Sequence, residues 1–229
     1  MSDTTPSGAP HNASEATAQG HAPRKIIITI GRQFGSGGRE LGRRLAARLG
    51  IPYYDKELLS RAASNAGVAE EFVTGNDERS PRFLSSVMSF SMGFAPVTWY
   101  QNPSSISAES IYTSQSDTIR RIADEGSCVI VGRSADYVLR GNPGLVSVFV
   151  HAPLESCVAR IIARGDSLTP DKARRLAEKT NRLRASYYNF YTDRVWGHAD
   201  SYDLCFDTSL LPIDDIAAVI TDYISRRFA

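Results

Sequence analysis

Residues 31–40 read GRQFGSGGRE and follow directly on the apolar run IIITI at residues 26–30. Glycines let the main chain turn tightly and direct several N–H groups toward one point, and the start of a following helix adds partial positive charge. The stretch therefore predicts a phosphate-binding loop between a buried strand and an amphipathic helix, rather than a merely flexible turn. Its candidate contacts are Gly35, Ser36, Gly37, Gly38, Arg39 and Glu40.

The spacing of this loop departs from the common phosphate-loop pattern G-x-x-x-x-G-K-[ST]. If Arg39 takes the place of the lysine, Gln33 stands where the first glycine belongs, and without a gap Gly38 occupies the lysine position. Either alignment lacks the lysine, so Arg39 or Arg32 must supply the positive charge. Glu40 stands near the usual Ser/Thr position, where a carboxylate could hold a metal-bound water or simply favour the first turn of a helix.

The elements that must position this loop alternate along the chain. Short apolar runs predict strands, and helical spacing of apolar residues predicts helices between them. An α/β fold follows, with a parallel sheet covered on both faces and its ligands outside the carboxyl ends of the strands. The predicted strands are 26–30, 127–132, 145–152 and 202–209, and the predicted helices are 38–50, 55–67, 107–126, 153–164, 169–188 and 213–227.

Composition limits the possible partners. The chain has 229 residues with 26 basic and 25 acidic side chains, a net charge of +1 that gives no general case for binding nucleic acid or a membrane. The polar residues 1–24 predict a disordered tail, and no run reaches the length of a membrane span. Three separated cysteines in apolar surroundings predict buried reduced thiols and a cytoplasmic protein. They are Cys128, Cys157 and Cys205.

Several stretches together resemble a known family. RQFGSGGRELG, LGIPYYDKELL and VIVGRSADYVL are similar to the cytidylate-kinase-like family of nucleoside monophosphate kinases, and the resemblance runs from residue 25 to residue 229. It implies a P-loop kinase-like three-layer sandwich with a parallel central sheet, a helical monophosphate-binding insertion and a helical lid. It also implies ATP and Mg²⁺. We expect an inserted subdomain at about 68–107 and the lid at about 160–190.

The resemblance also assigns residues to the acceptor. YDKELLSR matches the segment that places Asp55 and Arg61 in the monophosphate site. GRS matches the family's GRD, which makes Arg133 a substrate-binding arginine while Ser134 replaces the aspartate. NRLR matches the lid segment D-x-x-R, in which Arg184 is retained and Asn181 replaces the acid. These two replacements affect groups that help to hold the nucleoside.

Arginines are the residues that such chemistry needs. Transfer between two nucleotides requires positioning and neutralisation of phosphate oxygens rather than a strong base, and the guanidinium group binds phosphate in a bidentate manner. Arg39, Arg164 and Arg184 are therefore the candidate catalytic residues, whereas Arg160 and Arg182 are equally compatible with an exposed basic surface. Tyrosines in the lid helix are expected to pack it.

The sequence thus predicts an ATP-dependent nucleoside monophosphate kinase that acts on CMP or dCMP first. One alternative is a P-loop kinase of another small metabolite. The other is a nucleotide-binding sensor that has lost transfer together with its lysine. The sequence leaves the oligomeric state open.

Overall fold

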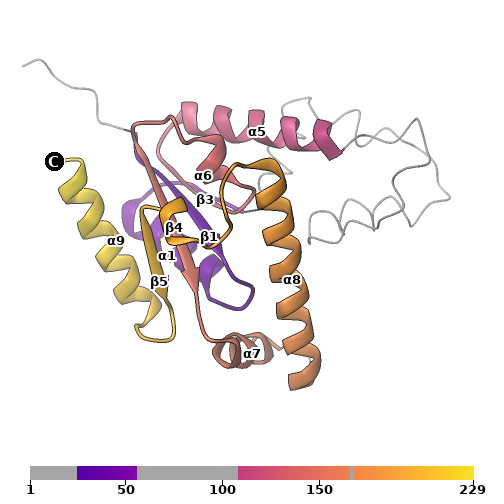
Figure 1. The fold of residues 1–229 in the computed structure, drawn as a ribbon. Coiled ribbons are helices and arrows are strands. Elements are labelled where there is room, and N and C mark those ends of the chain that lie inside the picture. Colours follow the sequence, from indigo (N-terminus) through magenta and orange to yellow (C-terminus); the bar gives the residue numbers. More distant parts are fainter. Residues whose placement is uncertain (1–24, 56–107, 166–167) are drawn as a thin grey trace, which may run out of the picture.

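A computed structural model of the protein describes residues 25–55, 108–165 and 168–229 (Figure 1). The predicted tail at 1–24, the predicted helix at 55–67 beyond Asp55, and the predicted subdomain at 68–107 lie outside the described residues. The described elements alternate between strand and helix as expected. In chain order they are β1 (Ile27–Arg32), α1 (Gly38–Leu49), β2 (Tyr53–Tyr54), α5 (Ala108–Glu125), β3 (Cys128–Val131), α6 (Ala135–Val138), β4 (Leu145–His151), α7 (Leu154–Ala163), α8 (Pro170–Tyr191), the 3₁₀ turn Ala199–Ser201, β5 (Leu204–Asp207) and α9 (Ile213–Arg227).

The strands form one five-stranded sheet in the order β2-β3-β1-β4-β5. Every neighbouring pair is parallel, so all carboxyl ends lie at one edge. β1 lies in the centre, where Ile28 pairs with Val129 of β3 on one side and with Val146 of β4 on the other. Strands β2 and β3 lie on one side of β1, and strands β4 and β5 lie on the other. Ligands of open α/β sheets bind where the strand order changes direction in this way.

Side chains of β1 alternate between two cores. Ile28 and Ile30 pack with residues of α1 and α9 on one face of the sheet, whereas Ile27 packs with residues of α5 on the other. Figure 1 shows α1 and α9 on one side of the strands and α5 with α6 on the other. The predicted parallel sheet covered on both faces is therefore confirmed. Because β1 is buried in the centre of this sheet, it holds the start of the following loop in a fixed position.

Helices α7 and α8 form a separate layer beside the carboxyl edge of the sheet. They pack through a small core that contains Ile161 of α7 and Ala177 of α8. Thr169 caps α8 by accepting a hydrogen bond from the Lys172 N–H, with Pro170 as the first helical residue, which agrees with the helix start predicted at residue 169.

Three sequence expectations need correction. Pro153 is the N-cap of α7 rather than a member of its first turn, because its φ of −51° with ψ of 143° is extended. Helix α8 continues to Tyr191 instead of ending at residue 188. Cys205 is exposed although Cys128 and Cys157 are buried, because β5 is the edge strand and its residues alternate outward. None of the described helices is long and apolar enough to cross a membrane.

Candidate active site

The glycine loop connects the end of β1 to the start of α1. Gly35 and Gly37 adopt φ of +84° and +86°, a region that glycine occupies without strain. Helix α1 then begins at Gly38, and the Leu41 N–H donates to the Gly37 carbonyl. Among the described residues, none accepts a hydrogen bond from the N–H groups of Gly37, Gly38 or Arg39. These free donors at a helix start suit a phosphate anion, as predicted.

Two of these glycines are also required by close neighbours. A Cβ at Gly35 would lie 2.7 Å from the Cys157 carbonyl oxygen, which belongs to the backbone of α7. A Cβ at Gly38 would lie 2.6 Å from the Cβ of Arg32. The loop therefore packs closely against α7 and against the end of β1, and neither position 35 nor position 38 has room for a side chain.

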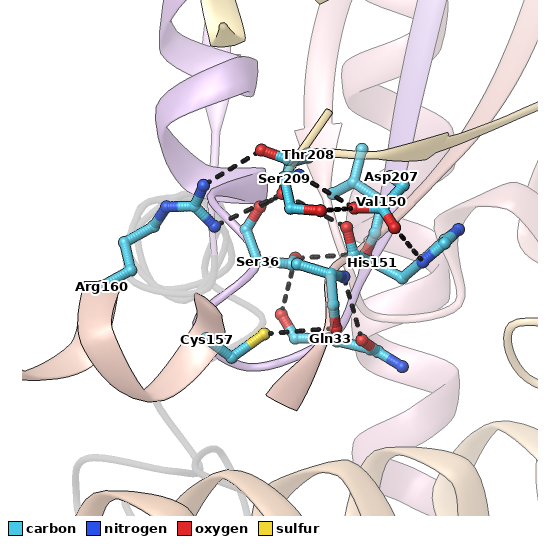
Figure 2. A network of polar contacts seen from close by, with 10 residues as sticks. Gln33, Ser36, Val150, His151, Cys157, Arg160, Asp207, Thr208 and Ser209 are labelled. Atoms are coloured by element: carbon cyan, nitrogen blue, oxygen red, sulfur yellow. Dashed lines mark hydrogen bonds and ion pairs between the residues drawn. The ribbon is translucent and has the colours of Figure 1, made fainter. Parts of the chain in front are cut away.

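The inner side of the loop is held by a network of hydrogen bonds (Figure 2). The buried Ser36 hydroxyl lies 2.9 Å from the Gln33 carbonyl oxygen and 3.1 Å from that of Val150, so it donates within the protein. Thr208, directly after β5, donates from its hydroxyl to the Ser36 carbonyl at 2.7 Å. Ser36 thus shapes the loop with its side chain, and its part in a phosphate site is to place the neighbouring N–H groups.

Arg160 belongs to the same network. Its guanidinium donates to the Gly35 carbonyl at 3.0 Å and to the Thr208 carbonyl at 3.2 Å (Figure 2). The sequence left Arg160 open between a lid contact and an exposed surface, and the structure shows instead a partly buried brace between the loop and the turn after β5. Sequence reasoning gave no signal for this role.

Two side-chain amides connect the loop to neighbouring segments of the chain. The Phe34 N–H donates to Asn181 Oδ1 of α8 at 2.7 Å, and the Ala152 N–H donates to Gln33 Oε1 at 3.3 Å. The sequence connected Asn181 with the nucleoside, but here its oxygen is bound to the loop. A neutral amide accepts this bond without adding the negative charge that an aspartate would bring near phosphates.

Arginines gather at the carboxyl ends of β1 and β3. Arg32, Arg133 and Arg184 are partly buried. Burial lowers the pKa of Arg32 to about 10, with the charges of Arg133 and Arg39 contributing. Burial also holds the pKa of Arg184 well below its usual range, together with the charges of Arg32, Arg39, Arg133 and Arg164. The structure therefore brings the predicted Arg39, Arg133, Arg164 and Arg184 into one positive region, which a polyanionic ligand would stabilise.

Arg184 connects this region to the loop. Its guanidinium donates to the Arg32 carbonyl at 3.0 Å, and its central carbon lies 5.5 Å from the centre of the Phe34 ring. Arg39 and Glu40 lie exposed at the start of α1, and Arg164 lies exposed at the end of α7. Arg182 is exposed on α8, and its charge is not among those that mainly lower the pKa of Arg184. Arg61 lies outside the described residues.

The turn after β3 has an unusual backbone. Arg133 and Ser134 follow Gly132 with φ of 62° and 51°, although residues other than glycine seldom adopt such angles. The Ser134 hydroxyl is buried without a hydrogen-bond partner among the described residues. Strained backbone of this kind is concentrated at functional sites. The turn thus directs Arg133 and its neighbours toward the same edge as the glycine loop.

Acidic and aromatic groups complete the surroundings. The Tyr53 hydroxyl donates to Asp55 Oδ2 at 3.4 Å, and Asp55 is buried at the end of β2. Asp136 accepts a 2.6 Å hydrogen bond from the Tyr188 hydroxyl, and burial raises the pKa of this carboxyl group. Tyr191 stacks on Tyr112 of α5 with ring centres 4.4 Å apart. Tyr188 and Tyr191 therefore pack α8 against the rest of the fold, and the expected packing role of these tyrosines is confirmed.

A parallel sheet with a glycine loop after its central strand and an arginine-rich carboxyl edge is the arrangement of a P-loop kinase. A solved gluconokinase from Sinorhizobium meliloti shares this fold with a TM-score of 0.51 and 16% identity, over 88% of this chain and 93% of that one. The protein belongs to the cytidylate kinase-like family, whose sequence profile matches residues 27–210.

Two further relatives extend over most of the chain. A cytidylate kinase from Pyrobaculum aerophilum is 24% identical over 200 residues, which cover 86% of this chain and 92% of that protein. The crystal structure of an uncharacterized protein from Eubacterium ventriosum is 30% identical, with a TM-score of 0.65, and covers 89% of this chain and 99% of that one. Family and fold together make the protein a phosphotransferase of the P-loop kinase type, a class that uses ATP and Mg²⁺.

Proposed function

We propose that the protein transfers the γ-phosphoryl group of ATP to a nucleoside monophosphate, with CMP or dCMP as the first choice. The observation that supports this most is the convergence of Arg133 and Arg184 with the glycine loop at one edge of the sheet. A monophosphate acceptor brings a dianion to this edge, whereas an acceptor with only hydroxyl groups leaves the arginine charges uncompensated. The cytidylate kinase relative supports the choice of base.

In this proposal the loop binds the donor phosphates through the N–H groups of Gly37, Gly38 and Arg39. Arg133 and Arg184, together with Asp55 and Arg61, hold the acceptor. Arg39, Arg164 and Arg184 neutralise charge on the phosphoryl group in transit. No strong base is needed because the attacking oxygen already belongs to an ionised phosphate.

Magnesium would enter with ATP. No group of three or more His, Cys, Asp or Glu side chains forms a metal site among the described residues. Mg²⁺ usually keeps several waters and is held by substrate phosphates and one or two carboxylates. Glu40 in the first turn of α1 is the carboxylate next to the loop that would hold it through water. The ion supplies neutralisation of phosphate oxygens when it is bound.

A panel of acceptors tests the proposal. ADP release is measured with ATP, Mg²⁺ and each nucleoside monophosphate in turn, with gluconate as a non-phosphorylated comparison. We expect CMP or dCMP to be used, and a preference for CMP over UMP and AMP below about a hundredfold. Ser134 and Asn181 replace acids of the family pattern, and polar groups that reject wrong partners supply most specificity. If gluconate alone is phosphorylated, the protein is a P-loop kinase of another small metabolite. If ATP binds but no acceptor is phosphorylated, the protein is a nucleotide-binding sensor.

Arg133 provides a test of the acceptor site. Replacing Arg133 with alanine is expected to lower kcat/KM for the monophosphate at least about tenfold, because each hydrogen bond to a charged group contributes about 1.5–3 kcal/mol. The affinity for a nonhydrolysable ATP analogue, measured by calorimetry, stays unchanged. The matched control is Arg140→Ala, since Arg140 lies exposed beyond α6, where its side chain hydrogen-bonds to the Tyr137 carbonyl and lies over the Tyr137 ring. Loss of analogue binding with normal acceptor kinetics in Arg133→Ala would reverse the two sites.

A further inference from the structure

The position of the missing lysine is filled from elsewhere in the chain. In the ungapped alignment Gly38 stands where a P-loop lysine belongs. A Cβ at Gly38 would lie 2.6 Å from the Cβ and 2.9 Å from the Cγ of Arg32. A lysine at position 38 would therefore begin in space that the Arg32 side chain already occupies. The Arg32 side chain therefore fits in its observed position because residue 38 is a glycine.

The other end of Arg32 reaches the acceptor side. A Cβ at Gly132 would overlap the Arg32 guanidinium, so this group lies directly against the end of β3, beside Arg133. The side chain thus runs from the start of α1 to the turn that presents Arg133.

The guanidinium itself is unused by the fold. No described residue accepts a hydrogen bond from it or forms an ion pair with it, although the Arg32 carbonyl is bound by Arg184. Burial removes part of its hydration and the neighbouring charges of Arg133 and Arg39 repel it, and the weaker attraction of Asp55 does not offset these effects, so that its pKa falls to about 10. A partly buried cation without an acceptor is costly unless a ligand supplies the anion.

We propose that Arg32 replaces the P-loop lysine and binds the phosphoryl group as it passes from the donor loop to the acceptor. In this step the acceptor phosphate oxygen forms a bond to the γ-phosphorus. The bond from that phosphorus to the β–γ bridging oxygen breaks, and ADP leaves with the electron pair. Arg32 stays protonated throughout and neutralises equatorial oxygens. Its planar fork can contact donor and transferred group together, which a lysine ammonium does less well.

This inference rests on the proposed function, and Arg39 offers the direct comparison. Arg39 is exposed, and its charge is screened by water. Arg32→Gln is expected to lower kcat by at least about a hundredfold, as the loss of one preorganised electrostatic donor does, and Arg39→Gln by less. Arg32→Lys retains part of the activity. If Arg39→Gln abolishes transfer while Arg32→Gln retains it, Arg39 is the replacement and the proposal is wrong.

A second measurement needs no turnover. Without ligand, Arg32→Gln is expected to raise the melting temperature by about 2–4 °C, because a repelled charge disappears from the arginine cluster. The rise in melting temperature that Mg²⁺ and the ATP analogue produce in the unmodified protein should shrink in the same variant. Arg226→Gln, which removes an exposed α9 arginine, should change neither value. Lower stability together with undiminished ligand response in Arg32→Gln would contradict the proposal.

The coupling of positions 32 and 38 gives the sharpest test. Gly38→Lys should destabilise the protein that retains Arg32, because the two side chains compete for one space. In an Arg32→Gly background, which removes both the Cβ and the Cγ that lie within 3 Å of the added Cβ, the same change should be tolerated and should raise kcat at least about tenfold above that of Arg32→Gly alone. Equal effects of Gly38→Lys in both backgrounds would overturn the proposal. If the unmodified protein phosphorylates no acceptor in the panel, the proposed function fails, and the stability and analogue-binding measurements still decide the role of Arg32.

Discussion

Replacing Gly35 with alanine is expected to abolish donor binding, with the affinity for a nonhydrolysable ATP analogue falling at least about a hundredfold. The residue adopts φ of +84°, where a Cβ costs about 1–3 kcal/mol. The added methyl group would also lie 2.7 Å from the Cys157 carbonyl oxygen, and backbone of α7 cannot turn aside as a flexible side chain would. The loop must therefore move, and its N–H groups lose their common direction.

Gly50 supplies the matched control for this prediction. It ends α1 with φ of +64°, but no atom lies within 4 Å of a Cβ at that position. Gly50→Ala therefore carries the cost of the backbone angle alone, and we expect a lower melting temperature with normal analogue affinity. Calorimetry on both variants separates the two effects. Analogue affinity that is unchanged in Gly35→Ala would show that the donor does not bind at this loop.

The sheet and the loop were predictable because their signals are local. The run IIITI, the glycines and the spacing of Leu41 and Leu45 lie within a few turns of chain, and each fixes its own element. The same is true of α8, whose Thr169 cap and Pro170 mark its start within two residues. Local rules gave these elements to within a few residues of their observed ends.

The contacts that shape the loop were not predictable in this way. Asn181 is 147 residues from Phe34 in sequence, and Arg160 is 125 residues from Gly35. No periodicity connects such pairs, and an arginine on a helix face is compatible with a brace, a ligand contact or an exposed surface. The choice between Arg32 and Arg39 was open for the same reason, since it depends on which side chain the packing of Gly38 and Gly132 directs inward.

One helix contacts both parts of the proposed site. Through Asn181, α8 holds the Phe34 N–H of the donor loop, and one turn later Arg184 holds the Arg32 carbonyl. Farther along α8, Tyr191 packs on α5. Helix α8 is therefore hydrogen-bonded both to the proposed donor loop and to the end of β1.

Arg184 contributes both a hydrogen bond and a charge at this edge, and Arg184→Ala is expected to lower kcat by about two to three orders of magnitude. The change removes a cation from the cluster around Arg32 and breaks the bond to the Arg32 carbonyl, so that both the charge and its placement are lost. Arg184→Lys keeps the positive charge but loses the planar guanidinium that can donate two parallel hydrogen bonds, and intermediate activity is expected. Steady-state kinetics with saturating ATP and acceptor measure these effects.

The control for Arg184 lies two residues earlier on the same helix. Arg182 is exposed and its charge is not among the main causes of the lowered pKa of Arg184, so Arg182→Ala should retain activity within about threefold, as expected for a surface change. Melting temperatures of both variants show whether α8 remains packed. If kcat falls equally in the two variants, α8 acts through its overall charge. If both variants keep the activity of the unmodified protein, Arg184 has no role in the mechanism. A large loss in Arg184→Ala alone, with the fold intact, places the reacting phosphoryl group beside this guanidinium, at the carboxyl edge of β1.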